Sequence, residues 1–111
     1  MKNYSEIISK AKEIIIKEIS PEKIIIFGSI PLNLYNKDSD IDIFIIKNCK
    51  KEETRKYKLL IRKKLRELIF KYKISFDIFL DSKERFEKRL KTYNDQFYKE
   101  IINKGKIIYE K

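Results

Sequence analysis

The sequence predicts an α/β (α+β) fold, in which a small mixed β-sheet carries helices packed mainly on one side. Amphipathic helical segments alternate with short apolar segments that are typical of buried strands. Only two glycines and two prolines occur, so nothing resembles a flexible linker. A chain of 111 residues can bury one ordinary core, and we expect residues 1–111 to form a single domain.

The first half of the chain begins with an amphipathic helix. Isoleucines recur at helical spacing over residues 4–19, and Ser20-Pro21-Glu22 ends the helix. The expected elements that follow are a buried strand, a short helix or turn, a polar turn and a second strand, at residues 23–27, 30–35, 36–39 and 40–46.

The second half repeats the alternation. A long helix with one apolar stripe is expected over residues 51–72, and a third strand over 74–80. Asp81-Ser82 can cap a helix that begins near Lys83. The last expected elements are a helix ended by Gly105 and a final strand, at residues 94–103 and 106–109.

Composition excludes several classes of function. The chain has no histidine, which removes Ser-His-Asp and Cys-His catalysis and histidine-based zinc sites. Its one cysteine cannot form an internal disulfide, which fits a reducing compartment. The N-terminus lacks the features of a signal peptide, and no apolar run approaches the ~20 residues that span a bilayer. We therefore expect a soluble, cytoplasmic protein without a membrane partner.

The net charge of +10 would be consistent with nucleic-acid binding, but that interpretation is not favoured. The lysines are spread over every segment, which is typical of a solvated surface, and a basic helix face at 58–66 is read in the same way. The charge still indicates anionic ligands such as nucleotides. The aromatic residues Tyr93, Phe97 and Tyr98 are expected in the core rather than as a base-stacking platform, with a partner surface as the alternative.

Two aspartates occupy the second expected strand. Asp40 and Asp42 lie two residues apart and therefore point to the same face, about 7 Å apart along the backbone. The intervening isoleucines point to the core. Because like-charged carboxylates repel each other, a hard cation such as Mg²⁺ best explains the pair. The alternative is a solvated edge strand with two surface acids.

Asp77 offers a third carboxylate. It lies opposite the apolar face of the third strand, where an aspartate is unfavourable by propensity. If this strand neighbours the second, three carboxylates converge, which can hold two metal ions for displacement at phosphorus. The alternative is a surface aspartate or an ion-pair partner.

Gly28-Ser29 follows the first expected strand directly. Glycine allows close approach of the backbone to a phosphate, and N–H groups at a helix start, with a serine hydroxyl, donate to phosphate oxygens. Such turns are common, so the indication comes from the constellation of Gly28-Ser29, ten residues, an Asp-x-Asp strand and then Asp77.

Phe27-Gly28-Ser29 followed by Ser39-Asp40-Ile41-Asp42-Ile43 resembles the minimal nucleotidyltransferase domains of the DNA polymerase β superfamily, over essentially the whole chain. The resemblance implies the nucleotidyltransferase fold, ATP as substrate and two Mg²⁺ ions, with Mn²⁺ as an alternative. It implies that Asp40, Asp42 and Asp77 bind metal, that Asp77 accepts the proton of the attacking hydroxyl, and that Gly28 and Ser29 hold the β- and γ-phosphates. Family members of this size pair with small helical HEPN toxins, and several transfer AMP to a toxin tyrosine.

One position departs from the family pattern. Leu32 stands where the family often has arginine, which removes a triphosphate-binding cation and puts turnover and nucleotide choice in question. Lys37 is one candidate to compensate, and Asn33 can replace the usual glycine.

Three functions remain open from sequence. The leading one is an adenylylating antitoxin; the second is a non-catalytic antitoxin that docks on its toxin; the third is a nucleotidyltransferase acting on RNA or a small molecule. About thirty residues follow Asp77, so we expect a partner to supply further substrate surface. The sequence leaves open which molecule accepts the nucleotide and which base is preferred. It also leaves open the identity of the partner and whether the protein forms homo- or hetero-oligomers.

Overall fold

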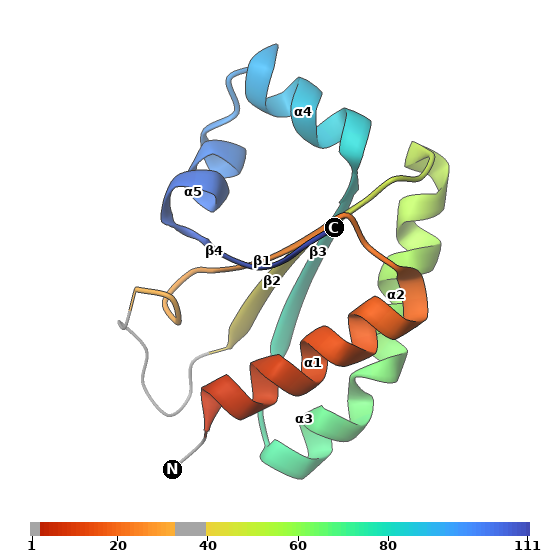
Figure 1. The fold of residues 1–111 in the computed structure, drawn as a ribbon, viewed down its shortest axis with the longest axis vertical. Helices are drawn as coiled ribbons and strands as arrows, with labels where there is room; N and C mark the ends of the chain where they lie inside the picture. The colour runs from red at the N-terminus through yellow and green to blue at the C-terminus, as the bar shows by residue number, and fades with distance from the viewer. Residues whose placement is uncertain (1–2, 33–39) are drawn as a thin grey trace.

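A sheet of four strands, with helices over both faces, forms the described part of the protein (Figure 1). The computed structural model describes residues 3–32 and 40–111. The elements in chain order are α1 (Tyr4–Ile19), β1 (Lys23–Phe27), β2 (Ile41–Lys47), the short 3-10 helix η1 (Lys51–Glu53), α2 (Thr54–Lys64), α3 (Arg66–Tyr72), β3 (Phe76–Ser82), α4 (Lys83–Lys91), α5 (Gln96–Lys104) and β4 (Lys106–Glu110).

The sheet is mixed, with strand order β3-β2-β1-β4. β2 and β3 run parallel, whereas β1 pairs antiparallel with both β2 and β4. The β1–β4 pair contains a bulge, because Ile24 pairs with Tyr109 and Ile25 pairs with Ile107, which leaves Ile108 as an extra residue in β4.

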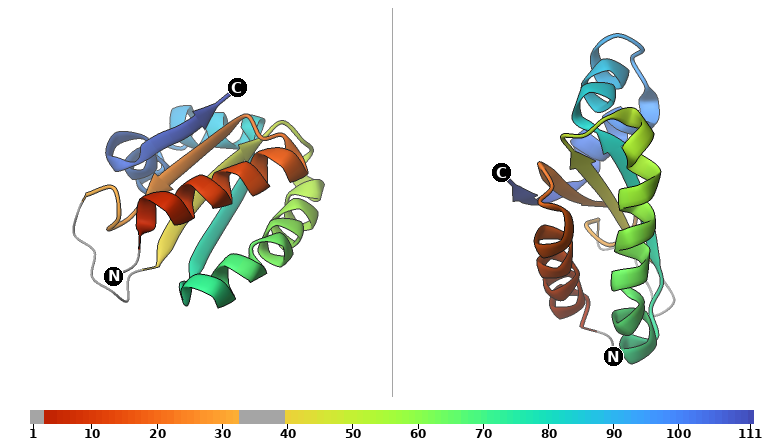
Figure 2. Two further views of the ribbon diagram at one scale, coloured as in Figure 1. Left: turned by 60° about the horizontal axis from the view of Figure 1, so that its bottom comes forward. Right: turned by 90° about the vertical axis from the view of Figure 1, so that its right-hand side faces the viewer.

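The two faces of the sheet bury different side chains. Helices α1, α2 and α3 cover one face, and α4 and α5 cover the other (Figures 1 and 2). Alternation along the strands assigns Ile24, Ile43 and Ile45 to the core under α1–α3. Ile25 and Phe44 pack instead under α4 and α5. The predicted α/β class, with a small mixed sheet and most helices on one side, is confirmed.

Local signals explain where the elements end. Ser20 ends α1 in a left-handed conformation with φ of 48°, and its N–H donates to Ile16 O. The expected helix over 51–72 is divided at Leu65, where Leu68 N–H donates to Leu65 O three residues back. Both segments still bury one stripe, because Ile61, Leu65 and Leu68 all lie in the core.

The start of the third predicted strand differs from the structure. The third strand begins at Phe76 rather than residue 74, because Lys73 ends α3 in a left-handed conformation and Ile74 packs in the core before the strand starts. Residues 28–32 form turns, so the described part of the segment expected as a short helix or turn over 30–35 is a turn. The polar turn at 36–39, and Lys37 within it, lie outside the described residues. No helix in the described ranges is long and apolar enough to cross a membrane.

Candidate active site

Three neighbouring strands bring predicted site residues into one row. In the sheet register Phe27 of β1 pairs with Asp42 of β2, and Asp42 pairs with Asp77 of β3. Directly paired residues project from the same face of a sheet, so the carboxylates of Asp42 and Asp77 lie side by side. That face is the one covered by α4 and α5, because Phe44 and Phe79 follow at alternate positions. The expectation that the second and third strands are neighbours is correct.

The two carboxylates interact strongly. Asp42 is partly buried, and this burial, followed by a hydrogen bond with Asp77 and the negative charges of Asp77 and Asp40, raises the pKa of Asp42 to about 6. Within the described residues no lysine or arginine forms an ion pair with any of these three aspartates. The ion-pair explanation of Asp77 therefore has no support in the described chain.

Asp40 lies just before the strand that carries Asp42. It directly precedes β2, which begins at Ile41, and its side chain is exposed. Ile41 N–H donates to Ser75 O at 2.9 Å, which ties the start of β2 to the segment before β3. Asp40 is close enough to add its charge to the surroundings of Asp42. The structure thus places Asp42 and Asp77 side by side on one sheet face, with Asp40 nearby at the start of β2.

Gly28 packs directly on the acidic row. Its φ of +79° lies in the left-handed region, which disfavours any residue with a side chain. A methyl group built on Gly28 would also overlap the Asp42 carboxylate. Glycine is therefore required here for two independent reasons, and the turn that carries Ser29 begins next to the acids.

A pocket of about 440 Å³ opens beside this turn. Gly28, Ser29 and Leu32 form one wall, and α5 forms the other. Phe97 belongs to that second wall and is 40% exposed, so it does not lie in the core as the sequence predicted. Tyr93 is likewise exposed, whereas Tyr98 packs against the buried cluster. The contribution of α5 has no signal in the sequence, because it depends on how this helix docks.

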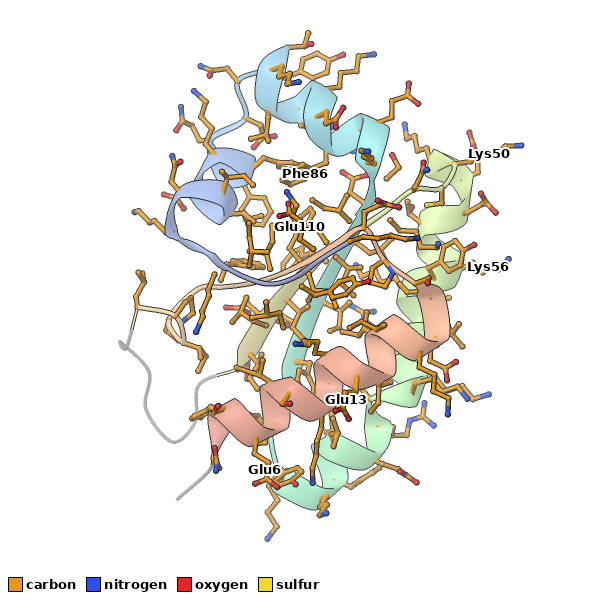
Figure 3. All side chains as sticks on the ribbon, in the orientation of Figure 1. Glu6, Glu13, Lys50, Lys56, Phe86 and Glu110 are labelled. Atoms are coloured by element: carbon orange, nitrogen blue, oxygen red, sulfur yellow. The ribbon has the colours of Figure 1, made fainter. Side chains whose placement is uncertain are left out.

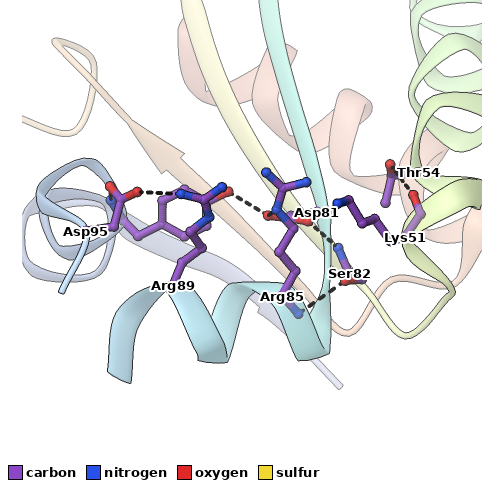
Figure 4. A network of polar contacts seen from close by, with 8 residues as sticks. Lys51, Thr54, Asp81, Ser82, Arg85, Arg89 and Asp95 are labelled. Atoms are coloured by element: carbon purple, nitrogen blue, oxygen red, sulfur yellow. Dashed lines mark hydrogen bonds and ion pairs between the residues drawn. The ribbon is translucent and has the colours of Figure 1, made fainter. Parts of the chain in front are cut away.

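The sequence alone did not assign Asp81, a further acid on the same face, to a polar network. Asp81, at the far end of β3, is 5% exposed. It accepts hydrogen bonds from Tyr98 Oη at 2.5 Å and Ser82 N at 2.9 Å, and Arg85 Nε lies 3.6 Å away (Figure 4). The spacing of four residues from Asp77 could have placed both acids on one face. Ser82 still caps α4, as predicted, by accepting from Arg85 N.

An aromatic cluster separates the two acidic ends. Phe44 lies beneath Phe86 and Tyr98, with ring centroids 5.3 and 5.5 Å away. Figure 3 shows Phe86 between α4 and the sheet. Phe79 continues the cluster toward Phe27, at 5.4 Å. Among the described residues, this cluster therefore fills the middle of the face, between the Asp42–Asp77 pair and Asp81.

A left-handed glycine directly after a buried strand thus lies beside two adjacent aspartates. The family model described as "Nucleotidyltransferase domain" matches residues 8–109, and the chain belongs to this family.

Two known proteins are similar to this chain. One, from Methanocaldococcus jannaschii, is named as a candidate protein adenylyltransferase; it is 30% identical over 88 residues, which are 79% of this chain and 78% of the relative. The other is a crystal structure of a candidate nucleotidyltransferase from Sulfolobus solfataricus, with a TM-score of 0.64 and 15% identity. The match covers 96% of this chain and 79% of the other, and it shows the fold alone.

Proposed function

We propose that the protein is a metal-dependent nucleotidyltransferase that transfers AMP from ATP to a hydroxyl, namely a tyrosine of a partner HEPN toxin. The observation that carries the chemistry is that Asp42 lies beside Asp77 in the sheet and directly against Gly28. The protein acceptor is supported by the similarity of the chain to one candidate protein adenylyltransferase, from Methanocaldococcus jannaschii.

The carboxylates have the chemistry that divalent metal ions require. In the described residues no three acidic, cysteine or histidine side chains form a ready metal cage. Asp42 and Asp77 nevertheless share a hydrogen bond and repel as charged groups, and oxygen donors of this kind suit Mg²⁺. Asp40, Asp42 and Asp77 would hold the metal. Two bound Mg²⁺ ions would neutralise the acids and stabilise charge on the phosphate oxygens.

The protein groups orient the substrate for in-line displacement. The backbone N–H groups of the Gly28-Ser29 turn and the Ser29 hydroxyl would donate to the β- and γ-phosphates. The acceptor oxygen attacks the α-phosphorus and forms the new P–O bond. The bond between the α-phosphorus and the bridging oxygen breaks, and pyrophosphate leaves. Asp77, which is exposed at the edge strand, accepts the proton of the attacking hydroxyl.

Mass spectrometry of the acceptor tests this proposal. The chain is incubated with ATP, Mg²⁺ and a HEPN protein encoded in the same genome, and a tyrosine of that protein is expected to gain one AMP. Asp40→Ala should reduce the transfer while leaving the complex of the two proteins intact. Equal AMP addition by wild type and Asp40→Ala would contradict the assigned chemistry.

The second candidate function is an antitoxin that inhibits its toxin by docking alone. Leu32 favours it, because an exposed leucine lines the phosphate-side pocket where the family often has arginine. A toxin that is inhibited by the chain but carries no AMP would support this candidate.

A further inference from the structure

The pocket beside the Gly28-Ser29 turn contains one basic side chain. Its lining residues are Phe27, Gly28, Ser29, Leu32, Phe97, Glu100, Ile101 and Lys104. Leu32 leaves the turn side of the pocket without a cation. Lys104 is therefore the positive charge among the described residues that line it.

The sheet fixes the position of Lys104. β4 pairs antiparallel with β1, and Ile26 pairs with Lys106. Lys104, the last residue of α5, lies two residues before Lys106, and Gly28 lies two residues after Ile26. Both Lys104 and Gly28 line the pocket. Gly105 makes this approach tight, because a methyl group there would lie 2.7 Å from Ile25 Cγ2 and would overlap Ile101 O. The end of α5 is thus held closely against β1.

We propose that Lys104 binds the β- and γ-phosphates of the nucleoside triphosphate and supplies the charge that Leu32 does not. This inference rests on the proposed function, and it assigns the pocket to the triphosphate end of the substrate. A lysine ammonium binds phosphate oxygens as a point charge and needs no fixed planar geometry.

Negative groups surround Lys104, so phosphate binding in this pocket depends on the Lys104 charge. Glu100, which also lines the pocket, lies 3.8 Å from Lys104 Nζ, and these two side chains are 66% and 62% exposed. The C-terminal end of α5 carries partial negative charge. Both features repel a phosphate. Because exposed ion pairs of this kind are weak, a triphosphate can draw Lys104 away from Glu100.

Ligand binding distinguishes this role from a general effect of charge. ATP, inorganic triphosphate and AMP are titrated separately into the protein with Mg²⁺ and no acceptor. Lys104→Gln should weaken ATP and inorganic triphosphate by about fivefold to tenfold and leave AMP unchanged. Lys99→Gln is the matched control, because it removes the same charge from the same helix outside the pocket.

Two further variants test the mechanism. Leu32→Arg in the Lys104→Gln background should restore triphosphate binding, and Glu100→Gln alone should strengthen it about twofold to threefold, because it releases Lys104. Equal effects of Lys104→Gln and Lys99→Gln, or an equal loss of AMP binding, would overturn the inference. Failure of the wild-type protein to bind ATP at all would instead overturn the proposed function.

Discussion

Asp77 and Asp81 lie four residues apart on the same face of β3, yet their surroundings are opposite. Asp81 is buried and satisfied, with Tyr98, the Ser82 N–H and Arg85 around its carboxylate. Asp77 is exposed and has Asp42, another acid, as its neighbour. A buried charge with such partners stabilises a fold, whereas adjacent acids without a cation destabilise it. The comparison teaches that partners, not residue type or strand position, separate the structural acid from the candidate catalytic ones.

The largest expected effect is a difference in AMP transfer between substitutions of Asp42 and of Asp81. Asp42→Asn should reduce AMP transfer by roughly a thousandfold or more, because the metal-binding charge contributes several kcal/mol of transition-state stabilisation. Asp81→Asn should retain transfer at a temperature where it is folded. Initial rates of AMP transfer to the partner protein measure both. Comparable losses of activity in the two variants would break the distinction.

The next largest expected difference is in how much Mg²⁺ stabilises the Asp42 and Asp81 variants. Mg²⁺ at 100 times its dissociation constant should stabilise the wild-type protein by about 2.7 kcal/mol. Thermal unfolding with and without Mg²⁺ should show this shift in wild type and in Asp81→Asn. Asp42→Asn should show a much smaller shift. An identical response of Asp42→Asn and wild type would remove Asp42 from the ligand set.

For the free energy of unfolding the order is reversed, because substitution of Asp81 should cost more stability than substitution of Asp42. Asp81→Asn should lower the free energy of unfolding by about 2 kcal/mol, because charge-assisted bonds from Tyr98 and Ser82 are weakened inside the protein. Tyr98→Phe keeps the ring and loses only its hydroxyl, so about half of that loss is expected. Urea unfolding measures both values. A neutral effect of Asp81→Asn would contradict the structural role.

The smallest effect concerns Asp42 without metal. Its pKa is raised to about 6 from an ordinary 3.8, so between these values the folded protein binds more protons than the unfolded chain. The contribution of Asp42 to stability therefore falls as pH rises through that window. In EDTA, Asp42→Asn should be more stable than wild type by less than about 1 kcal/mol at pH 7.5, after allowance for solvent screening. The difference should vanish near pH 4, as measured by urea unfolding at both values.

Much of the fold could be predicted from local patterns. The isoleucine stripe and Ser20-Pro21 defined α1, and the apolar run 23–27 defined β1, with the bounds that the structure shows. Alternation also placed Ile41, Ile43 and Ile45 of β2 in the core and Asp42 on the other face. Those elements are predictable because their burial depends on sequence spacing alone.

The remainder depends on tertiary contacts. The division at Leu65 leaves the apolar stripe unchanged, so periodicity could not reveal it. Phe97 and Lys104 join the candidate site only because β4 pairs with β1 and holds the end of α5 in place. Asp81 resembled a simple helix cap in the sequence, and Tyr98, which satisfies it, is seventeen residues away.

The bulge in β4 has a consequence for association. β4 is an edge strand, and an edge with regular spacing offers its free N–H and C=O groups to strands of other molecules. The extra residue Ile108 breaks that spacing in the middle of the strand, and Lys106 and Glu110 place charges at its ends. Ile107, which is 48% exposed, is therefore presented on an edge that cannot extend smoothly into a neighbouring sheet. The bulge therefore disfavours edge-to-edge strand pairing between molecules, which is the step by which an isoleucine-rich protein would form fibres.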